Sequence, residues 1–119
     1  MQELAIDIKI LEGKSCLITL DGVLNNDTSE ELFEAIQSLF NRKIWKLIID
    51  LSGVSYMGSP GIGLFISLLD TLDAHKGTIV FISPQENVKE VFKLFKLSTF
   101  YSITNNLQDA IKELEDLSH

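Results

Sequence analysis

The sequence predicts an α/β fold: a single domain over residues 1–119, with a mixed sheet of four or five strands and four helices in the order ββαβαβαβα. Strand-like segments alternate along the chain with segments whose apolar residues recur at helical spacing, which favours right-handed crossovers. Only Glu12-Gly13-Lys14 separates the first two strands, which predicts an antiparallel hairpin. Residues 45–50 are largely apolar, as expected of a central strand that is covered on both faces.

The two hairpin strands are expected to bury one side each. Residues 4–10 alternate between apolar and more polar side chains, so one side carries Leu4, Ile6, Ile8 and Ile10. Residues 15–20 place Cys16, Ile18 and Leu20 inward. Because free cysteines are commonly buried, we expect the lone cysteine to be a core residue rather than a reactive thiol.

The first two helices are predicted from capping signals and apolar stripes. Thr28 and Glu31 have the capping-box spacing, and the helix that follows carries the stripe Leu32, Phe33, Ala35, Ile36, Leu39 and Phe40. This helix makes the strand at 45–50 parallel to the strand before it. A loop over residues 51–58 then leads into a second helix from Ser59 to about His75.

The last third of the chain is expected to add two strands and two helices. Residues 78–82 form a strand, and Pro84 starts a helix whose inner face carries Val88, Val91, Phe92 and Phe95. Residues 100–103 form a short final strand. The last helix has the stripe Leu107, Ala110, Ile111 and Leu114.

Composition excludes several classes of protein. The net charge of -7 and the scattered basic residues argue against nucleic acid as a partner. One cysteine excludes an intrachain disulfide and fits a reducing compartment. The chain has no secretory signal pattern and no apolar run of the roughly 20 residues that span a bilayer, so no membrane partner is expected. These observations predict a cytoplasmic protein.

Enzymatic chemistry has little support in the sequence. Of the two histidines, His75 lies at a predicted helix end and His119 is the last residue. Neither accompanies a nucleophile pattern, and no cluster has the spacing of metal ligands. We therefore expect no catalytic site, no metal and no cofactor.

The informative stretch runs from Asp50 to Leu64, from the end of a central strand to the start of a helix. Ser59 followed by Pro60 is a favourable helix start, and the glycines Gly58, Gly61 and Gly63 leave the serine hydroxyl accessible. A helix N-terminus also tolerates a phosphate. Two interpretations remain open from the residues alone: Ser59 is only a helix cap, or it is a phosphorylation site.

A nucleotide cradle is a competing interpretation of the same glycines. Their spacing, G-x-x-G-x-G, is not the order of the dinucleotide fingerprint, and the sequence has no G-K-[ST] of a P-loop. A nucleotide-binding protein or small enzyme is therefore kept only as a lesser alternative.

The stretch resembles the STAS family, which includes bacterial anti-sigma-factor antagonists. The matching residues are Ile48-Ile49-Asp50-Leu51-Ser52-Gly53-Val54, Tyr56-Met57, Ser59, Gly61-Ile62-Gly63 and Leu64. An earlier segment, Leu20-Asp21-Gly22-Val23-Leu24 followed by Thr28, is similar to the family's turn before its first helix. The element order also agrees from about residue 4 to residue 117.

The resemblance implies a phosphorylation-controlled binding module. In the family, the unphosphorylated antagonist binds an anti-sigma factor that is also a serine kinase, and this frees the sigma factor. The kinase then phosphorylates a serine at the helix start, and a serine phosphatase resets the switch. Ser59 matches that serine, and no direct contact with nucleic acid or membrane is implied.

Three positions depart from the family pattern. The family's acids before the serine and at the end of the earlier turn are Gly58 and Asn25 here. Pro60 replaces a second Ser or Thr, so Ser59 is the only hydroxyl in that turn. The two acid losses remove negative charge beside the expected phosphoacceptor.

We expect the partner surface to combine two segments that follow successive strands at their carboxyl ends. Its residues are Leu24, Asn25, Asn26, Asp27, Thr28, Met57, Gly58, Ser59, Pro60 and Gly61. A second function of the same fold stays open, a scaffold or adaptor subunit that is not phosphorylated and belongs to a stress-signalling or lipid-transport complex.

Overall fold

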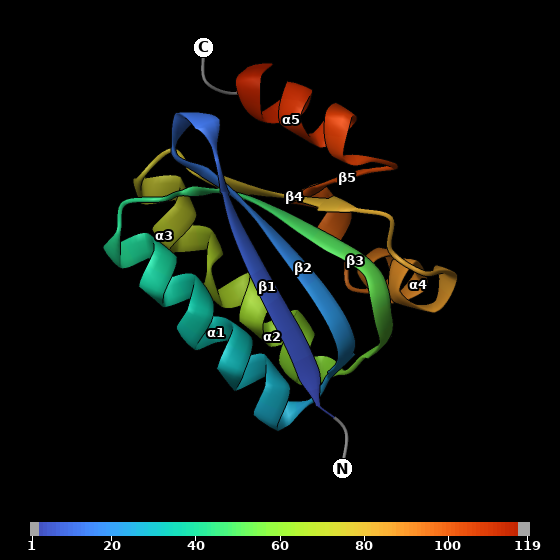
Figure 1. Ribbon diagram of the computed structural model, residues 1–119. Coiled ribbons are helices and arrows are strands. Elements are labelled where there is room, and N and C mark those ends of the chain that lie inside the picture. Colours follow the sequence, from blue (N-terminus) through green and yellow to red (C-terminus); the bar gives the residue numbers. More distant parts are fainter. Residues whose placement is uncertain (1–2, 117–119) are drawn as a thin grey trace.

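The computed structural model describes residues 3–116 and contains one five-stranded sheet in the order β1-β2-β3-β4-β5 (Figure 1). The strands are β1 (Leu4–Leu11), β2 (Ser15–Leu24), β3 (Lys46–Met57), β4 (Thr78–Ile82) and β5 (Ser102–Thr104). The helices are α1 (Asn26–Asn41), α2 (Ser59–Ser67), α3 (Leu69–Ala74), α4 (Glu86–Leu94) and α5 (Leu107–Asp116), with short 3-10 turns η1 (Glu12–Lys14) and η2 (Leu97–Thr99). The two ends of the expected domain, residues 1–2 and 117–119, lie outside the described residues, and so does His119.

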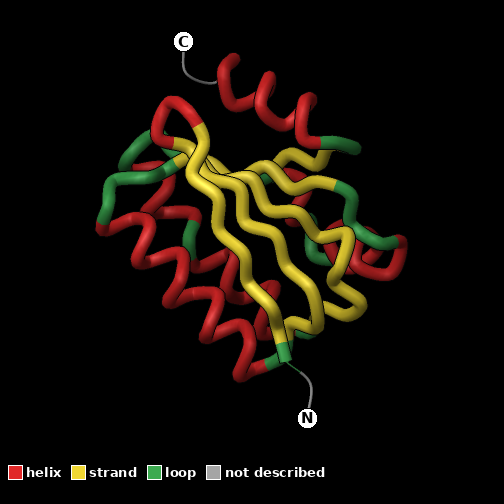
Figure 2. The backbone as a smooth tube through the Cα atoms, viewed as in Figure 1, coloured by secondary structure: helices red, strands yellow, loops and turns green. Residues whose placement is uncertain are grey.

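The predicted topology is confirmed. β1 and β2 form the antiparallel hairpin, and β2, β3, β4 and β5 are parallel to one another. Ile48 and Ile49 are fully buried, as a central strand requires, and they face opposite sides of the sheet. Residues of α1, α2, α3 and α4 belong to the core cluster on one face, whereas α5 covers the other face (Figure 2).

The larger core is built around aromatic rings that meet edge to face. Phe81 of β4 lies 4.9 Å from Phe65 of α2 and 4.8 Å from Phe92 of α4, measured between ring centroids. Tyr101 approaches Phe81 to 5.5 Å. Such contacts add to the gain from apolar burial. They join α2 and α4 to the central strands.

Cys16, Ile18 and Leu20 are fully buried, as expected. Burial raises the pKa of the Cys16 thiol, which keeps it in the neutral, less nucleophilic form. His75 also has a structural role: its ring stacks on Trp45 at 3.6 Å between centroids, and its Nδ1 donates to the Thr71 carbonyl at 2.9 Å.

The prediction of a loop over residues 51–58 is wrong, because β3 continues to Met57. Its pairing with β2 shifts register twice, once between Thr19 and Asp21 and once between Gly22 and Val23. These bulges interrupt the alternation of inward and outward side chains, so the alternating pattern typical of a strand is absent from residues 51–57. Gly22 has φ +137°, and a Cβ there would collide with the backbone of Glu3, so the irregularity requires glycine.

The predicted second helix is interrupted. It divides at Leu68 into α2 and α3, which together take the place of the second of the four predicted helices. The Tyr101 hydroxyl donates to the Phe65 carbonyl in the last turn of α2, where carbonyls lack partners within the helix. The hydrogen bond stabilises the end of α2 from outside the helix.

Several apolar residues expected inside lie at the surface. Ile8 and Ile10 of β1 are 40% and 45% exposed, because β1 is an edge strand. Phe95 is 50% exposed beyond the end of α4, and Ile111 of α5 is also exposed. Phe100 precedes β5, which begins two residues later than predicted, and is exposed too.

Within residues 3–116, none of the helices combines the length and the apolar character needed to cross a membrane.

Tyr101→Phe is expected to lower the free energy of unfolding by about 1–2 kcal/mol, because the Phe65 carbonyl would stay buried without its donor. Urea denaturation measures this change. Tyr56→Phe removes the same atom from a side chain that is 55% exposed and should change stability little, and equal losses in the two variants would contradict the assignment.

Candidate functional site

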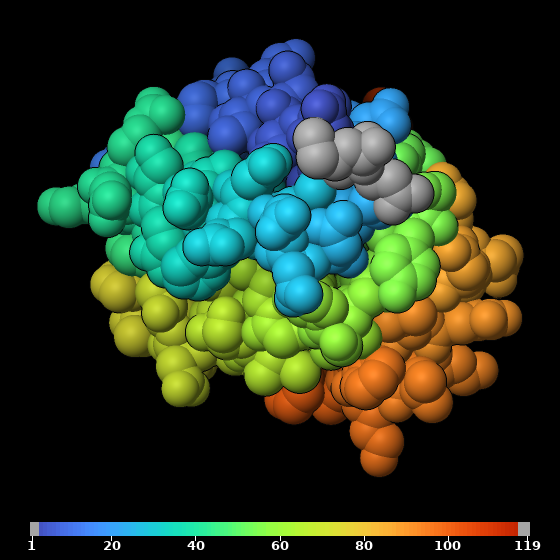
Figure 3. Space-filling model, turned by 90° about the horizontal axis from the view of Figure 1, so that it is seen from below, coloured from blue at the N-terminus to red at the C-terminus, as the bar shows by residue number. Residues whose placement is uncertain are grey.

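Two helices begin side by side at one edge of the sheet. β2 and β3 are adjacent and parallel, and their last residues, Leu24 and Met57, are paired. The Gly58 N–H donates to the Leu24 carbonyl at 2.9 Å. Seen from below, the start of α1 (cyan) and the start of α2 (yellow-green) form one continuous surface (Figure 3). The two segments of the expected partner surface are therefore neighbours.

Asn25, rather than Thr28, caps α1. The Asn25 side chain accepts from the Thr28 N–H at 3.0 Å, and the Thr28 hydroxyl accepts from the Asn25 N–H at 2.9 Å. The Thr28 hydroxyl also donates to the Val23 carbonyl at 2.7 Å. The capping box is thus one turn earlier than predicted, and Glu31 has no part in it, because Asn25 offers an equally favourable cap.

Gly58, rather than Ser59, is the cap residue of α2. Gly58 has extended backbone angles, Ser59 is the first helical residue, and Pro60 follows it. The Ser59 side chain is exposed. No hydrogen bond of its hydroxyl occurs within the described residues. The interpretation of Ser59 as a helix cap is therefore wrong, because Ser59 is the first residue of the helix.

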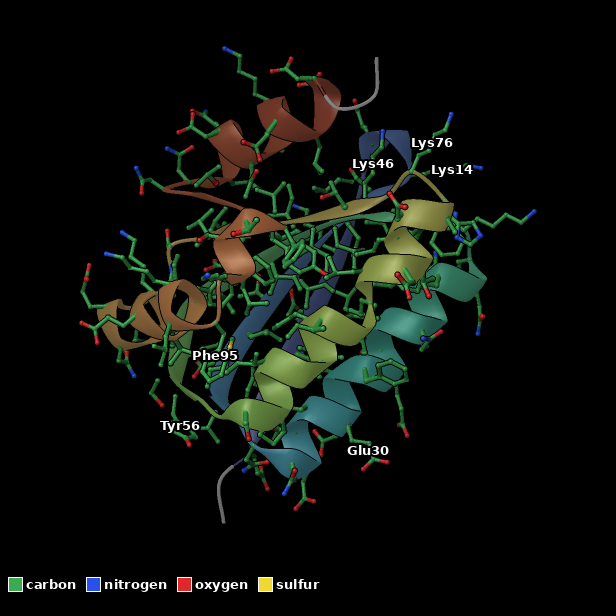
Figure 4. The ribbon with its side chains drawn as sticks, turned by 180° about the vertical axis from the view of Figure 1, so that it is seen from behind. Lys14, Glu30, Lys46, Tyr56, Lys76 and Phe95 are labelled. Carbon is green, nitrogen blue, oxygen red and sulfur yellow. The ribbon has the colours of Figure 1, made fainter. Side chains whose placement is uncertain are left out.

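Tyr56 is a surface residue of the site that the sequence reasoning missed. A Cβ added to Gly58 would lie 3.1 Å from the Tyr56 Oη, so the phenol ring lies over the cap of α2, next to Ser59. The ring is 55% exposed. Tyr56 and Glu30 mark the same end of the molecule, where α1 and α2 begin (Figure 4). Because residues 51–58 were predicted to be a loop, no orientation of this side chain followed from the sequence. The pairing of β3 with β2 determines its orientation.

Of the ten residues predicted to form the partner surface, five are at least partly accessible and five are buried. Asn26, Asp27 and Ser59 are exposed, while Asn25 and Pro60 are half-buried. The remaining five are buried and support the surface from below: Leu24, Thr28, Met57, Gly58 and Gly61. Any partner that docks here meets the first group together with Tyr56.

Beyond the end of β4, side chains form hydrogen bonds with the edge of β3 that faces β4. β4 pairs with β3 only as far as Asp50. Past it, the Gln85 side chain donates to the Ser52 carbonyl at 2.9 Å, and the Asn87 side chain donates to the Ser55 carbonyl at 2.7 Å. Two amides from the start of α4 thus replace a strand along the approach to Ser59.

The electrostatics of the edge favour an added anion. Free N–H groups at the starts of α1 and α2 carry partial positive charge, and both starts face the same surface. The first turn of α2 has no acidic residue, and the first turn of α1 has only Asp27. A phosphate on Ser59 would therefore lie near two helix N-termini, with Asp27 as the one carboxylate in their first turns.

In the part of the chain that the structure describes, no group of three His, Cys, Asp or Glu side chains is placed to hold a metal ion.

Comparison with known proteins gives consistent matches. The model of the STAS domain family matches residues 5–110. The anti-sigma-B factor antagonist of Listeria monocytogenes is 26% identical over 102 residues, which cover 86% of this chain and 90% of that protein. The anti-sigma F factor antagonist of Lysinibacillus sphaericus is 25% identical over 87 residues, 72% of this chain and 74% of that protein.

Solved structures show the same fold. The anti-sigma factor antagonist SpoIIAA in its unphosphorylated form has a TM-score of 0.82 at 21% identity, with 94% of this chain and 97% of that chain covered. The phosphorylated form of SpoIIAA from Bacillus has a TM-score of 0.73 at 22% identity, with coverages of 92% and 99%.

Gly61 and Gly63 allow a matched test of the contact between α2 and β2. A Cβ on Gly61 would lie 2.9 Å from the Met57 Cγ and 3.2 Å from the Leu24 Cβ, whereas a Cβ on Gly63 meets nothing within 4 Å. Gly61→Ala is expected to lower the free energy of unfolding by about 1–3 kcal/mol through overpacking. Gly63→Ala should raise it by about 0.5–1 kcal/mol, since alanine favours the helix. Urea denaturation of both variants decides, and stabilisation by Gly61→Ala would show that the helix has room to shift.

Proposed function

Because the chain belongs to the STAS domain family, we propose that it is an anti-sigma factor antagonist controlled by phosphorylation of Ser59. Unphosphorylated, it binds an anti-sigma factor with serine kinase activity and thereby releases a sigma factor. The names of the relatives from Listeria monocytogenes and Lysinibacillus sphaericus support this assignment. The protein is a binding module rather than an enzyme and acts in the cytoplasm.

The observation that carries the proposal is the exposed, unengaged hydroxyl of Ser59 at the first position of α2. A kinase needs a hydroxyl that it can reach without unfolding its substrate. The neighbouring Gly58 and Gly61 add no side chain around it, and Pro60 offers no competing hydroxyl. Ser59 is thus the acceptor within its turn.

The modification acts through local charge and bulk. A phosphoserine carries about -1.5 to -2 charges, and two helix N-termini accommodate them, so the domain has no reason to refold. In the complex with a partner, the phosphate has a much less favourable environment. The partner would have to bury a doubly charged group without a matching cation, and desolvation of such a group costs several kcal/mol. Phosphorylation therefore ends binding, and a serine phosphatase restores it.

The neutral residues Asn25 and Gly58 adapt the surface to a particular partner. Each occupies a position where the family pattern has an acid, so the edge of the unphosphorylated protein lacks two negative charges of that pattern. Contact with the partner then depends on shape, on hydrogen bonds of Asn26 and on the exposed Tyr56 ring. The Asp27 carboxylate is the one charge in the first turns of α1 and α2.

Ser59→Ala is expected to abolish phosphorylation by the cognate kinase and to stay bound to the anti-sigma factor in the presence of ATP. Ser59→Asp should weaken binding at least tenfold, about 1.4 kcal/mol, while its circular dichroism stays native. Phosphopeptide mapping and calorimetric titration measure the two effects.

Ser38→Asp is the matched control for charge, because Ser38 is exposed near the far end of α1. It should bind like the unmodified protein. Phosphate on another residue, or undiminished phosphorylation of Ser59→Ala, would show that the switch lies elsewhere.

Asp27→Lys is expected to weaken binding of the anti-sigma factor about tenfold or more without loss of stability, because Asp27 is exposed at the start of α1. Glu34→Lys makes the same charge change on α1 outside the site and should leave affinity within about twofold. Surface plasmon resonance compares the two. Equal effects would mean that the partner senses net charge and not this edge.

A further inference from the structure

β1 is an open edge of the sheet. It pairs only with β2 within the described residues, so every second residue of β1 directs its backbone N–H and C=O groups outward (Figure 1). The strand is eight residues long and has no proline and no glycine. Such an edge accepts another strand unless it is blocked.

The outer part of β1 also exposes apolar side chains. Ile8 and Ile10 are 40% and 45% exposed, while Ile6 on the same side packs against the core. Asp7 and Lys9 point to the opposite side of the sheet and are exposed as well. Single exposed isoleucines are ordinary, but two on one side of an edge strand form a surface that a neighbouring strand would cover with a gain in apolar burial.

We propose that β1 pairs with β1 of a second copy of this chain, in an antiparallel dimer centred on Ile8. In this register Ile8 faces the partner subunit's Ile8, and Ile6 faces the partner subunit's Ile10. Asp7 faces the partner subunit's Lys9, and by symmetry Lys9 faces the partner subunit's Asp7. The interface therefore holds two cross-strand ion pairs on one side of the sheet and a row of isoleucines on the other.

The sequence of β1 favours this register over its neighbours. A shift of one residue places Asp7 opposite an isoleucine and turns the apolar row to the wrong side. A shift of two residues places Asp7 opposite the partner subunit's Asp7, or Lys9 opposite the partner subunit's Lys9, and like charges directly opposite are destabilising. Only the pairing centred on Ile8 satisfies charge and burial together, and this self-complementarity identifies the occupant as a second copy.

The dimer leaves the Ser59 edge accessible. The two-fold axis passes beside Ile8, perpendicular to the plane of the sheet. The two sheets therefore join into one, and the strands of the two copies run in opposite directions. Ser59 lies beyond the end of β3, two strands away from β1. Both copies thus present their helix starts to solvent, at opposite ends of the assembly.

Sedimentation equilibrium of the full chain tests the proposal. At high concentration the molar mass should approach twice the 13.3 kDa of one chain and should fall on dilution, because an interface of one strand is small. Asp7→Lys alone and Lys9→Asp alone each place like charges opposite one another, so each should weaken self-association about tenfold. The double variant Asp7→Lys/Lys9→Asp restores the pairing and should dimerise like the natural sequence.

Mixing the two single variants gives the sharpest readout. One chain then carries two lysines on the edge and the other carries two aspartates, so the mixture should form heterodimers more tightly than either variant self-associates. Native circular dichroism of each variant shows that the change acts on association and not on folding.

A thiol at the centre tests the register. Ile8→Cys brings two introduced thiols to opposite positions, where Cβ atoms lie roughly 4.5–5.5 Å apart, so mild oxidation should link the chains. Ala5→Cys is equally an exposed position of β1, but it faces the partner subunit's Leu11 and should not crosslink. The natural Cys16 is buried and does not interfere.

Three results would overturn the proposal. They are a molar mass of one chain at every concentration, a dimer that ignores the charge variants, and crosslinking of Ala5→Cys in preference to Ile8→Cys. The first result also covers a chain that is monomeric by itself and pairs its β1 strand with an unrelated protein.

Discussion

The parallel pairing of β2 with β3 is the constraint on which the rest of the molecule depends. It continues past two bulges to the pair of Leu24 with Met57, and the hydrogen bond from the Gly58 N–H to the Leu24 carbonyl closes it. Because each strand is followed at once by a helix, this pairing fixes the starts of α1 and α2 beside each other. Residues far apart in the sequence are thereby joined into one surface. No local signal at either helix start specifies this closeness, and a change that loosened the pairing would separate them.

Small and neutral residues keep that junction tight. Gly61 lets α2 approach Leu24 to a distance that a methyl group would prevent, and Gly58 leaves room for the ring of Tyr56. Asn25 satisfies the start of α1 without adding charge. Of these residues, Gly58 and Asn25 depart from the family pattern, so the surface loses negative charge at two positions that also serve packing and capping.

The sequence predicted most of the fold because periodicity and turn residues agreed with each other. The hairpin, the buried central strand at Ile48 and Ile49, and the parallel order all followed from them. The predictions failed where two local patterns were both acceptable or where tertiary contacts decided. Asn25 with Thr28 and Thr28 with Glu31 both have capping spacing, and only the path of the chain from Val23 selects the first. The extension of β3 was hidden by bulges. The break at Leu68 lies where Tyr101 from another element donates to the Phe65 carbonyl, a contact that the local pattern does not reveal. The exposure of Ile8 and Ile10 depends on the absence of a neighbouring element beside β1 within the described residues.

The amide side chains of Gln85 and Asn87 give β3 an uneven stiffness. Up to Asp50 both sides of the strand are held by continuous ladders. Beyond it, one side is held by exposed side chains whose hydrogen bonds compete with water and open at lower cost. The segment from Leu51 to Met57 is therefore expected to open more easily on the side of Gln85 and Asn87 than on the side of β2. A protein that docked across it would restrict this opening, and the conformational entropy lost would offset part of the gain from contact. For the proposed partner, affinity at this edge would then depend also on how firmly two amides hold the strand, and not only on the residues that touch the partner.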